Sequence, residues 1–152
     1  KKLTDSDYEE RDKLEWEGGL YWSEENGVVI PSDNIERCIQ LGAQKSRIGK
    51  DVQAAVFCTE PEIKLDYDGP KTKEKLYESG KFELRKGVAI QKSRLIRLRP
   101  MFPTGWSIVF TLEYDESIVN VKSVFKATVD AGALIGLGDW RPKFGRFVSE
   151  MI

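Results

Sequence analysis

Histidine is absent from this chain of 152 residues. Histidine is the side chain that most often activates serine and cysteine nucleophiles, shuttles protons near neutral pH and binds zinc. These kinds of active site are therefore disfavoured. A nuclease that works without a metal would have to use lysine or tyrosine as its acid and base.

Cysteine is scarce, because Cys38 and Cys58 are the two thiols of the whole chain. One lies in a helical pattern and the other in a strand pattern, so their spacing excludes a Cys-x-x-Cys motif. We expect both to be reduced and buried as small hydrophobic residues. A disulfide between them is the alternative.

Long apolar runs are also missing. No stretch approaches the roughly 18 residues that a membrane-spanning helix requires, and none is typical of a signal peptide. Hydrophobic residues make up 40% of the chain and charged residues 32%, as in ordinary globular proteins. We therefore expect one soluble, cytoplasmic domain that has no membrane partner and is large enough to bury a core.

Charge is unevenly distributed, although the formal net charge is only −1. Residues 1–29 carry nine acidic and four basic side chains, whereas residues 81–99 carry seven basic side chains and one acidic side chain. The net charge of the whole chain does not reveal such local patches of charge. We expect a basic face that binds a polyanion, and an acidic face that repels it or docks on the basic face of a neighbouring copy.

Local signals predict helices and a hairpin in the first part of the chain. Ser6 and Glu9 form a candidate capping box, and Asn26–Gly27 is a strong hairpin-turn signal. The predicted elements are a helix over residues 3–17, a hairpin over 20–30, a helix from Ser32 or Asp33 to about Lys45, and a strand over 52–58. The second helix has a buried stripe at helical spacing, formed by Ile35, Cys38, Ile39 and Gly42.

The second half of the chain contains the clearest alternation of apolar and polar residues, at residues 106–114, which predicts a strand. The other predicted elements are a turn at 67–70, a short helix at 73–78, strand-like segments at 82–84 and 88–90, a helix at 121–134 and a last strand at 147–152. A strand, a helix, a glycine-rich loop and a strand in succession are typical of half of a ferredoxin-like α+β fold.

The most informative segment runs from Ala131 to Met151 and reads AGALIGLGDWRPKFGRFVSEM. Glycines leave the backbone open to another molecule, an indole can stack on a base, and cations can neutralise phosphate. The residues that make this segment a predicted binding loop are Gly136, Gly138, Gly145, Trp140, Arg141, Lys143 and Arg146. The alternative is a solvated helix end and turn before an edge strand.

Three segments together resemble the RAMP superfamily of CRISPR-associated proteins. The first is the glycine loop between a helix and a last strand. The second is Val29–Arg37, which is similar to the family's P-G-S-S-hydrophobic-K-G-x-x-R entry to its first helix, with Asp33 and Asn34 in place of small residues and Glu36 near the usual lysine. The third is Val88–Tyr114, where a basic middle and the turn at residues 102–105 precede an amphipathic strand.

The resemblance covers most of residues 29–152 and is greatest to backbone subunits, which assemble along guide RNA. It implies a single ferredoxin-like, RRM-like α+β domain, in which residues 1–28 are an acidic helix-and-hairpin extension and residues 29–152 are a RAMP-like core. The family's first core strand would be either residues 20–30 or a segment upstream. A compact phage or mobile-element relative used outside a CRISPR complex fits equally well.

Residues and resemblance together predict a non-catalytic protein that binds single-stranded nucleic acid, RNA rather than DNA, and that can form homo-oligomers along the strand. We expect no cofactor and no metal. The predicted binding residues are Lys45, Arg47, Lys50, Lys92, Arg94, Arg97, Arg99, Gly136, Gly138, Trp140, Arg141, Lys143 and Arg146.

Two other classes of function remain open. A structural or interaction protein would join copies of itself or a partner through complementary charged faces. A metal-dependent nuclease would draw on carboxylates in loops, with Asp51, Asp66, Asp68 and Asp139 as candidates. No paired-carboxylate motif, Walker loop or nucleophile elbow supports the nuclease, so we expect no catalysis.

Overall fold

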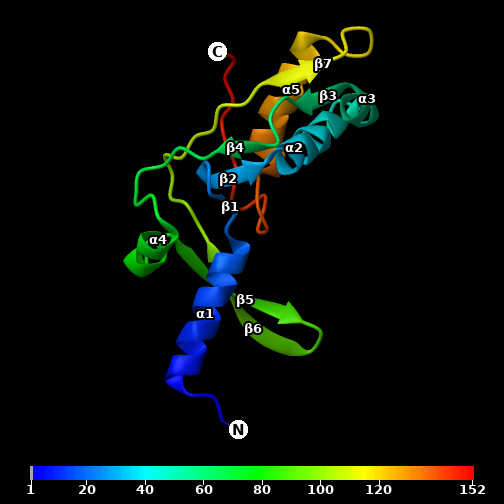
Figure 1. Cartoon of the computed structure of the whole chain (residues 1–152). Helices are drawn as coiled ribbons and strands as arrows, with labels where there is room; N and C mark the ends of the chain where they lie inside the picture. The colour runs from blue at the N-terminus through cyan, green and yellow to red at the C-terminus, as the bar shows by residue number, and fades with distance from the viewer. Residues whose placement is uncertain (1) are drawn as a thin grey trace. The chain divides into compact units, whose positions relative to one another are not determined.

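The computed structural model describes residues 2–152 and has an α+β architecture (Figure 1). Across these residues it contains five α-helices, a short π-helical turn and small antiparallel sheets. The predicted α+β class is confirmed. The strands fall into three separate sheets, ordered β1-β2-β4, β3-β7 and β5-β6, and a ferredoxin-like sheet is not confirmed.

The chain divides into two compact units. One joins the residues up to Val29 with Lys64–Ile108, and the other joins Ile30–Ile63 with Val109–Ile152. The acidic segment before residue 29 therefore shares its unit with the basic segment around residues 81–99, which the sequence analysis had assigned to the core.

The first unit begins with helix α1, Asp5–Gly19. Its capping box is Thr4 with Asp7: the Thr4 hydroxyl accepts a hydrogen bond from the Asp7 amide at 3.2 Å, and the Asp7 carboxylate accepts one from the Thr4 amide at 2.8 Å. The predicted box of Ser6 and Glu9 is wrong. The cap must have extended backbone angles, and Thr4 has them, whereas Ser6 already lies inside the helix.

The predicted hairpin around Asn26–Gly27 is confirmed. Strand β1, Trp22–Ser23, pairs antiparallel with β2, Gly27–Pro31, so that Trp22 lies opposite Val28. Gly27 has a φ of 70°, a left-handed angle that glycine adopts without strain. Strand β4, Glu62–Lys64, completes the order β1-β2-β4.

The core of the first unit is built around an indole. Trp16, on α1, is 0% exposed, and its Nε1 donates to the Phe82 carbonyl at 2.9 Å. Its ring lies 5.4 Å from that of Tyr77, on helix α4, Lys73–Ser79, which confirms the predicted short helix. Leu76 and Leu98 are buried in the same unit.

A long hairpin, the ribbon, consists of β5, Glu83–Ile90, and β6, Ser93–Pro100. The strand-like segments predicted at residues 82–84 and 88–90 thus belong to one strand, although Phe82 precedes it. The tight turn is made by Gln91 and Lys92, and Gln91 has a φ of 55°. We define residues 87–96 as the ribbon tip, where every residue except Val88 is exposed.

The second unit is organised by helix packing. Helix α2 is Ser32–Gln44, and α5, Val121–Asp130, continues into a π-helical turn, η1, Ala131–Ile135. Gly42 is a close-approach position, because a Cβ there would lie 2.6 Å from the Ala131 amide nitrogen. The predicted helices and the buried stripe of α2 are confirmed, but α2 begins after Pro31 without a side-chain cap from the described residues.

Three strand predictions are wrong in extent. Residues 52–55 belong to helix α3, Gly49–Ala55, and only β3, Val56–Cys58, is a strand. The long alternating segment 106–114 forms a ladder only at β7, Leu112–Tyr114, which pairs with β3. Residues 147–152 form no strand; the Phe147 amide donates to the Gly132 carbonyl instead.

A membrane-spanning helix is not found among residues 2–152, since every helix there is too short or too polar.

Candidate nucleic-acid interface

The segment from Gly136 to Arg146, which we call the glycine loop, is closed on itself by backbone hydrogen bonds. The Gly136 amide donates to the Ala131 carbonyl at 2.8 Å and ends the π-helical turn. The Leu137 amide donates to the Gly145 carbonyl at 2.9 Å, and the Phe144 amide donates to the Trp140 carbonyl at 3.0 Å. These bonds hold the two ends of the loop together.

The glycines of this loop serve mainly its closure. Gly136, Gly138 and Gly145 have φ angles of 79°, 94° and 82°, which favour glycine. A Cβ at Gly145 would collide with the backbone of Leu137, and one at Gly136 would lie 3.0 Å from the Phe144 carbonyl oxygen. The expectation that the glycines leave the backbone open to another molecule is wrong for the amides of Gly136 and Leu137, which already donate hydrogen bonds inside the protein.

The cations of the loop, in contrast, lie on its surface. Arg141, Lys143 and Arg146 are exposed, and Trp140 is half-buried. Arg141 Nη1 donates to the Gly138 carbonyl at 2.9 Å, and Arg146 Nε donates to the Pro142 carbonyl at 2.7 Å. A guanidinium has five donors, so each arginine is oriented by one bond and retains donor capacity for an anion.

Helix α2 lies against the base of the loop through Cys38. Its Sγ is 3.2 Å from the Gly136 carbonyl oxygen. Burial raises the pKa of this thiol to about 11, against an opposing effect of the Arg141 charge. Cys38 and Cys58 are both free thiols, so the structure contains no disulfide between them. Cys38 is buried as predicted, but the prediction that Cys58 is buried is wrong, because its side chain is half-buried at the end of β3.

A second group of predicted cations lies at the other end of α2. Lys45, Arg47 and Lys50 are exposed around the turn between α2 and α3. Arg47 has a φ of 63° within this turn. Because a helix rises about 1.5 Å per residue, Lys45 lies roughly 10 Å along α2 from Cys38.

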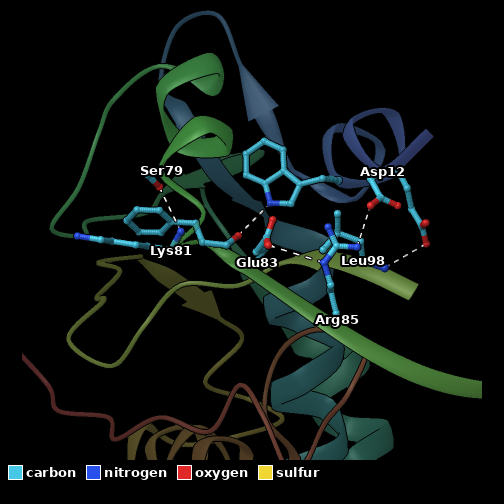
Figure 2. A network of polar contacts seen from close by, with 9 residues as sticks. Asp12, Ser79, Lys81, Glu83, Arg85 and Leu98 are labelled. Carbon is cyan, nitrogen blue, oxygen red and sulfur yellow. Dashed lines mark hydrogen bonds and ion pairs between the residues drawn. The ribbon is translucent and has the colours of Figure 1, made fainter. Parts of the chain in front are cut away.

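The arginines near the base of the ribbon are paired with α1 of the same chain. Arg85 Nη1 binds Asp12 at 2.8 Å (Figure 2). Arg97 and Arg99 both reach Glu15, at 3.6 and 3.0 Å. The hydrogen bond that Arg85 donates to the Asp12 carboxylate raises the pKa of Arg85 above its ordinary value. The acidic segment thus meets the basic segment within one chain, a pairing that the sequence analysis assigned to neighbouring copies.

The predicted binding residues therefore belong to separate places. Lys92 and Arg94 are exposed at the ribbon tip, in the first unit with the paired Arg97 and Arg99. The structure gathers the remaining ones in the second unit, as two groups: the turn at residues 45–50 and the glycine loop at 136–146. The sequence analysis missed Asp12 and Glu15 as partners, since no local signal indicates a contact across more than seventy residues.

The candidate nuclease carboxylates are divided in the same way, with Asp66 and Asp68 in the first unit and Asp51 and Asp139 in the second. Within residues 2–152, no three acidic or cysteine side chains gather as a metal would require.

Comparison with known proteins leaves the chain without a match. No protein-family model fits it, and no curated protein or solved structure is significantly similar to it. The resemblance to RAMP proteins stays a prediction that rests on the motifs of this sequence.

Proposed function

We propose that the chain binds single-stranded nucleic acid without catalysing a reaction, and that RNA is favoured over DNA. The observation that carries the proposal is the glycine loop: three exposed cations, Arg141, Lys143 and Arg146, within six residues of a backbone closed by its own hydrogen bonds. The preference for RNA rests on the resemblance to RNA-guided backbone subunits.

A closed cationic loop suits a polyanion for two reasons. Its side chains lose little conformational freedom on binding, because the bonds from Arg141 to Gly138 and from Arg146 to Pro142 already orient both guanidinium groups. Arginine also presents a planar fork that matches phosphate geometry. Trp140, next to Arg141, supplies an indole on which a base can stack.

The loop carries Asp139 as its single acidic side chain. Three basic side chains against one acidic side chain give a local charge of +2 in a chain whose total is −1. Phosphate binding responds to such local charge, and each neutralised phosphate releases counterions. The interaction is therefore expected to weaken steeply as salt concentration rises.

The test is a titration of labelled single-stranded RNA, single-stranded DNA and duplex DNA at several salt concentrations. Tight, salt-sensitive binding of one single strand supports the proposal. The triple variant R141E/K143E/R146E should bind much more weakly, and the salt slope of the binding that remains at low salt should be smaller in magnitude by about 2, at roughly 0.7 for each phosphate contact.

The matched control is K64E/K75E/K122E, which makes the same change in net charge at exposed lysines outside the predicted set. It should lose much less affinity than the loop variant. Equal losses would show that overall charge, and not this loop, governs binding. If the wild-type chain binds none of the three nucleic acids even at low salt, the proposed function is wrong.

A further inference from the structure

Two elements of the first unit extend into solvent beyond the point where they meet. All residues from Asp5 to Arg11 of α1 are exposed, and burial begins only with Asp12, Glu15 and Trp16. The ribbon tip is exposed in the same way. Figure 1 shows α1, in blue, and the ribbon, in green, running from their junction in different directions.

The exposed part of α1 is acidic. Asp5, Asp7, Glu9 and Glu10 stand there against Arg11 alone. Tyr8 is 47% exposed, and Leu14, six residues further along the helix, is 63% exposed. A helix of this length gains most of its stability from packing, and the first turns of α1 show none within the described part of the chain.

The ribbon tip has the opposite charge and an apolar surface. Lys92 and Arg94 are its exposed cations. Ile90, Leu95 and Ile96 are 43%, 42% and 65% exposed. In the register of the ribbon, Ile90 and Leu95 lie on one face, and Ile96 lies with Arg94 on the other. A two-stranded ribbon is marginally stable alone in water, and exposed apolar side chains on it favour an interaction surface.

We propose that the ribbon tip docks on the exposed first half of α1 in a second copy of this chain. Charge complementarity carries the assignment. The same two elements already meet within the chain, where Asp12 pairs with Arg85 and Glu15 with Arg99. Ion pairs between acidic side chains of α1 and basic side chains of the ribbon are therefore already present in this fold. The exposed part of α1 is likewise acidic, and the exposed ribbon tip is likewise basic.

Every copy carries both surfaces, so the contact is reciprocal. Two copies related by a two-fold axis each give a ribbon tip and receive one, which closes the assembly as a dimer. In each contact Lys92 and Arg94 face Glu9 and Glu10, and Ile96, which lies on the same face of the ribbon as Arg94, covers Tyr8. A nucleic acid would satisfy the two cations of the tip but would leave Ile96 without an apolar partner.

The test measures the mass of the full-length chain in solution without nucleic acid, by light scattering or sedimentation, at low and high salt. The wild-type chain should be a dimer that dissociates as salt rises. The variants K92E/R94E and E9K/E10K should each have a dimer dissociation constant raised by more than about tenfold, because like charges then face each other in both contacts.

Mixing the two variants provides the decisive measurement. In a mixed dimer, the reversed ribbon of one copy faces the reversed helix of the other, and the second contact is wild-type, so a heterodimer should form at near wild-type concentration. Its formation also shows that both variants are folded. The control K45E/R47E, which matches the charge change of K92E/R94E at exposed residues of the other unit, should remain dimeric.

A monomeric wild-type chain at all concentrations, or a mixture that stays monomeric, would overturn the proposal. The same holds if K92E/R94E remains dimeric, since the cations of the tip would then not contribute to the contact. The measurement omits nucleic acid, so its outcome is separate from that of the proposed function.

Discussion

Trp16 Nε1 on α1 donates a hydrogen bond of 2.9 Å to the carbonyl oxygen of Phe82, immediately before β5. Both residues are buried, at 0% and 4% exposure. This bond joins α1 to the base of the ribbon and brings Asp12 within reach of Arg85. The indole therefore determines where the acidic helix meets the basic strands.

Replacing Trp16 with Phe should lower the free energy of unfolding by about 1–3 kcal/mol, because the smaller ring leaves a cavity and the Phe82 carbonyl loses one of its two donors, keeping the Met101 amide at 2.9 Å. Urea denaturation followed by circular dichroism measures the change. Tyr21→Phe is the control, since the Tyr21 side chain is 53% exposed and a surface change of this kind costs within about 0.5 kcal/mol. Equal effects of the two substitutions would contradict the role given to the indole.

Gly145→Ala should destabilise the glycine loop more than Gly138→Ala. Both positions have left-handed φ angles, 82° and 94°, so both substitutions introduce backbone strain of about 1–2 kcal/mol. Only at Gly145 does the new Cβ also collide with the backbone of Leu137, whereas nothing lies within 4 Å of it at Gly138. Thermal melts should rank the two variants in this order, and RNA affinity should fall with Gly145→Ala.

Trp140→Ala should weaken binding of single-stranded RNA by about 1–3 kcal/mol, the value of one base stacked on an aromatic ring. The indole is half-buried, so the unfolding free energy must be measured beside the affinity. A variant that loses stability while its affinity for RNA is unchanged would identify Trp140 as a packing residue and remove it from the interface.

The two cysteines should be unreactive toward a thiol reagent at mildly alkaline pH in the folded chain and reactive after unfolding. Burial raises the pKa of Cys38 to about 11, and burial together with Glu36 and Glu60 raises that of Cys58 to about 11. The contribution of the two thiols to stability should therefore be constant below the unfolded thiol pKa near 9.0 and should be lost as pH rises from there toward about 11.

The sign follows from proton binding: in this range the folded chain keeps thiol protons that the unfolded chain has lost, so raising the pH favours unfolding. Urea denaturation at a series of pH values measures the decline. Cys38→Ala should make it shallower. An unchanged decline in that variant would mean that Cys38 titrates normally in the folded chain.

Local signals predicted much of the secondary structure. Helices α1, α2, α4 and α5 and the hairpin at Gly27 were all expected, because spacing, capping and turn chemistry act over a few neighbouring residues. The cap of α1 shows the limit of this information, since Thr4 with Asp7 and Ser6 with Glu9 fit the same pattern and only the backbone angles distinguish them.

The binding loop was predicted from composition, and its geometry was not. The sequence indicated a cationic segment at residues 136–146, but it could not show that Leu137 bonds to Gly145 and closes the loop. A glycine that frees the backbone for a ligand and a glycine that avoids a collision with the backbone of its own loop are identical in sequence.

The sequence by itself determined four of the five α-helices in the described residues, the hairpin turn and the charge of each segment, because these depend on neighbours along the chain. Tertiary structure alone decided which apolar segments become strands and which charges are neutralised. Residues 106–111 alternate like a strand, yet their pairing is limited to one bridge at Ser107. Alternation predicts an apolar face, but a ladder also requires a neighbouring strand within hydrogen-bonding distance. Glu15 forms ion pairs with Arg97 and Arg99 because folding brings residues that are distant in sequence together. Lys92 and Arg94, at the ribbon tip, stay exposed.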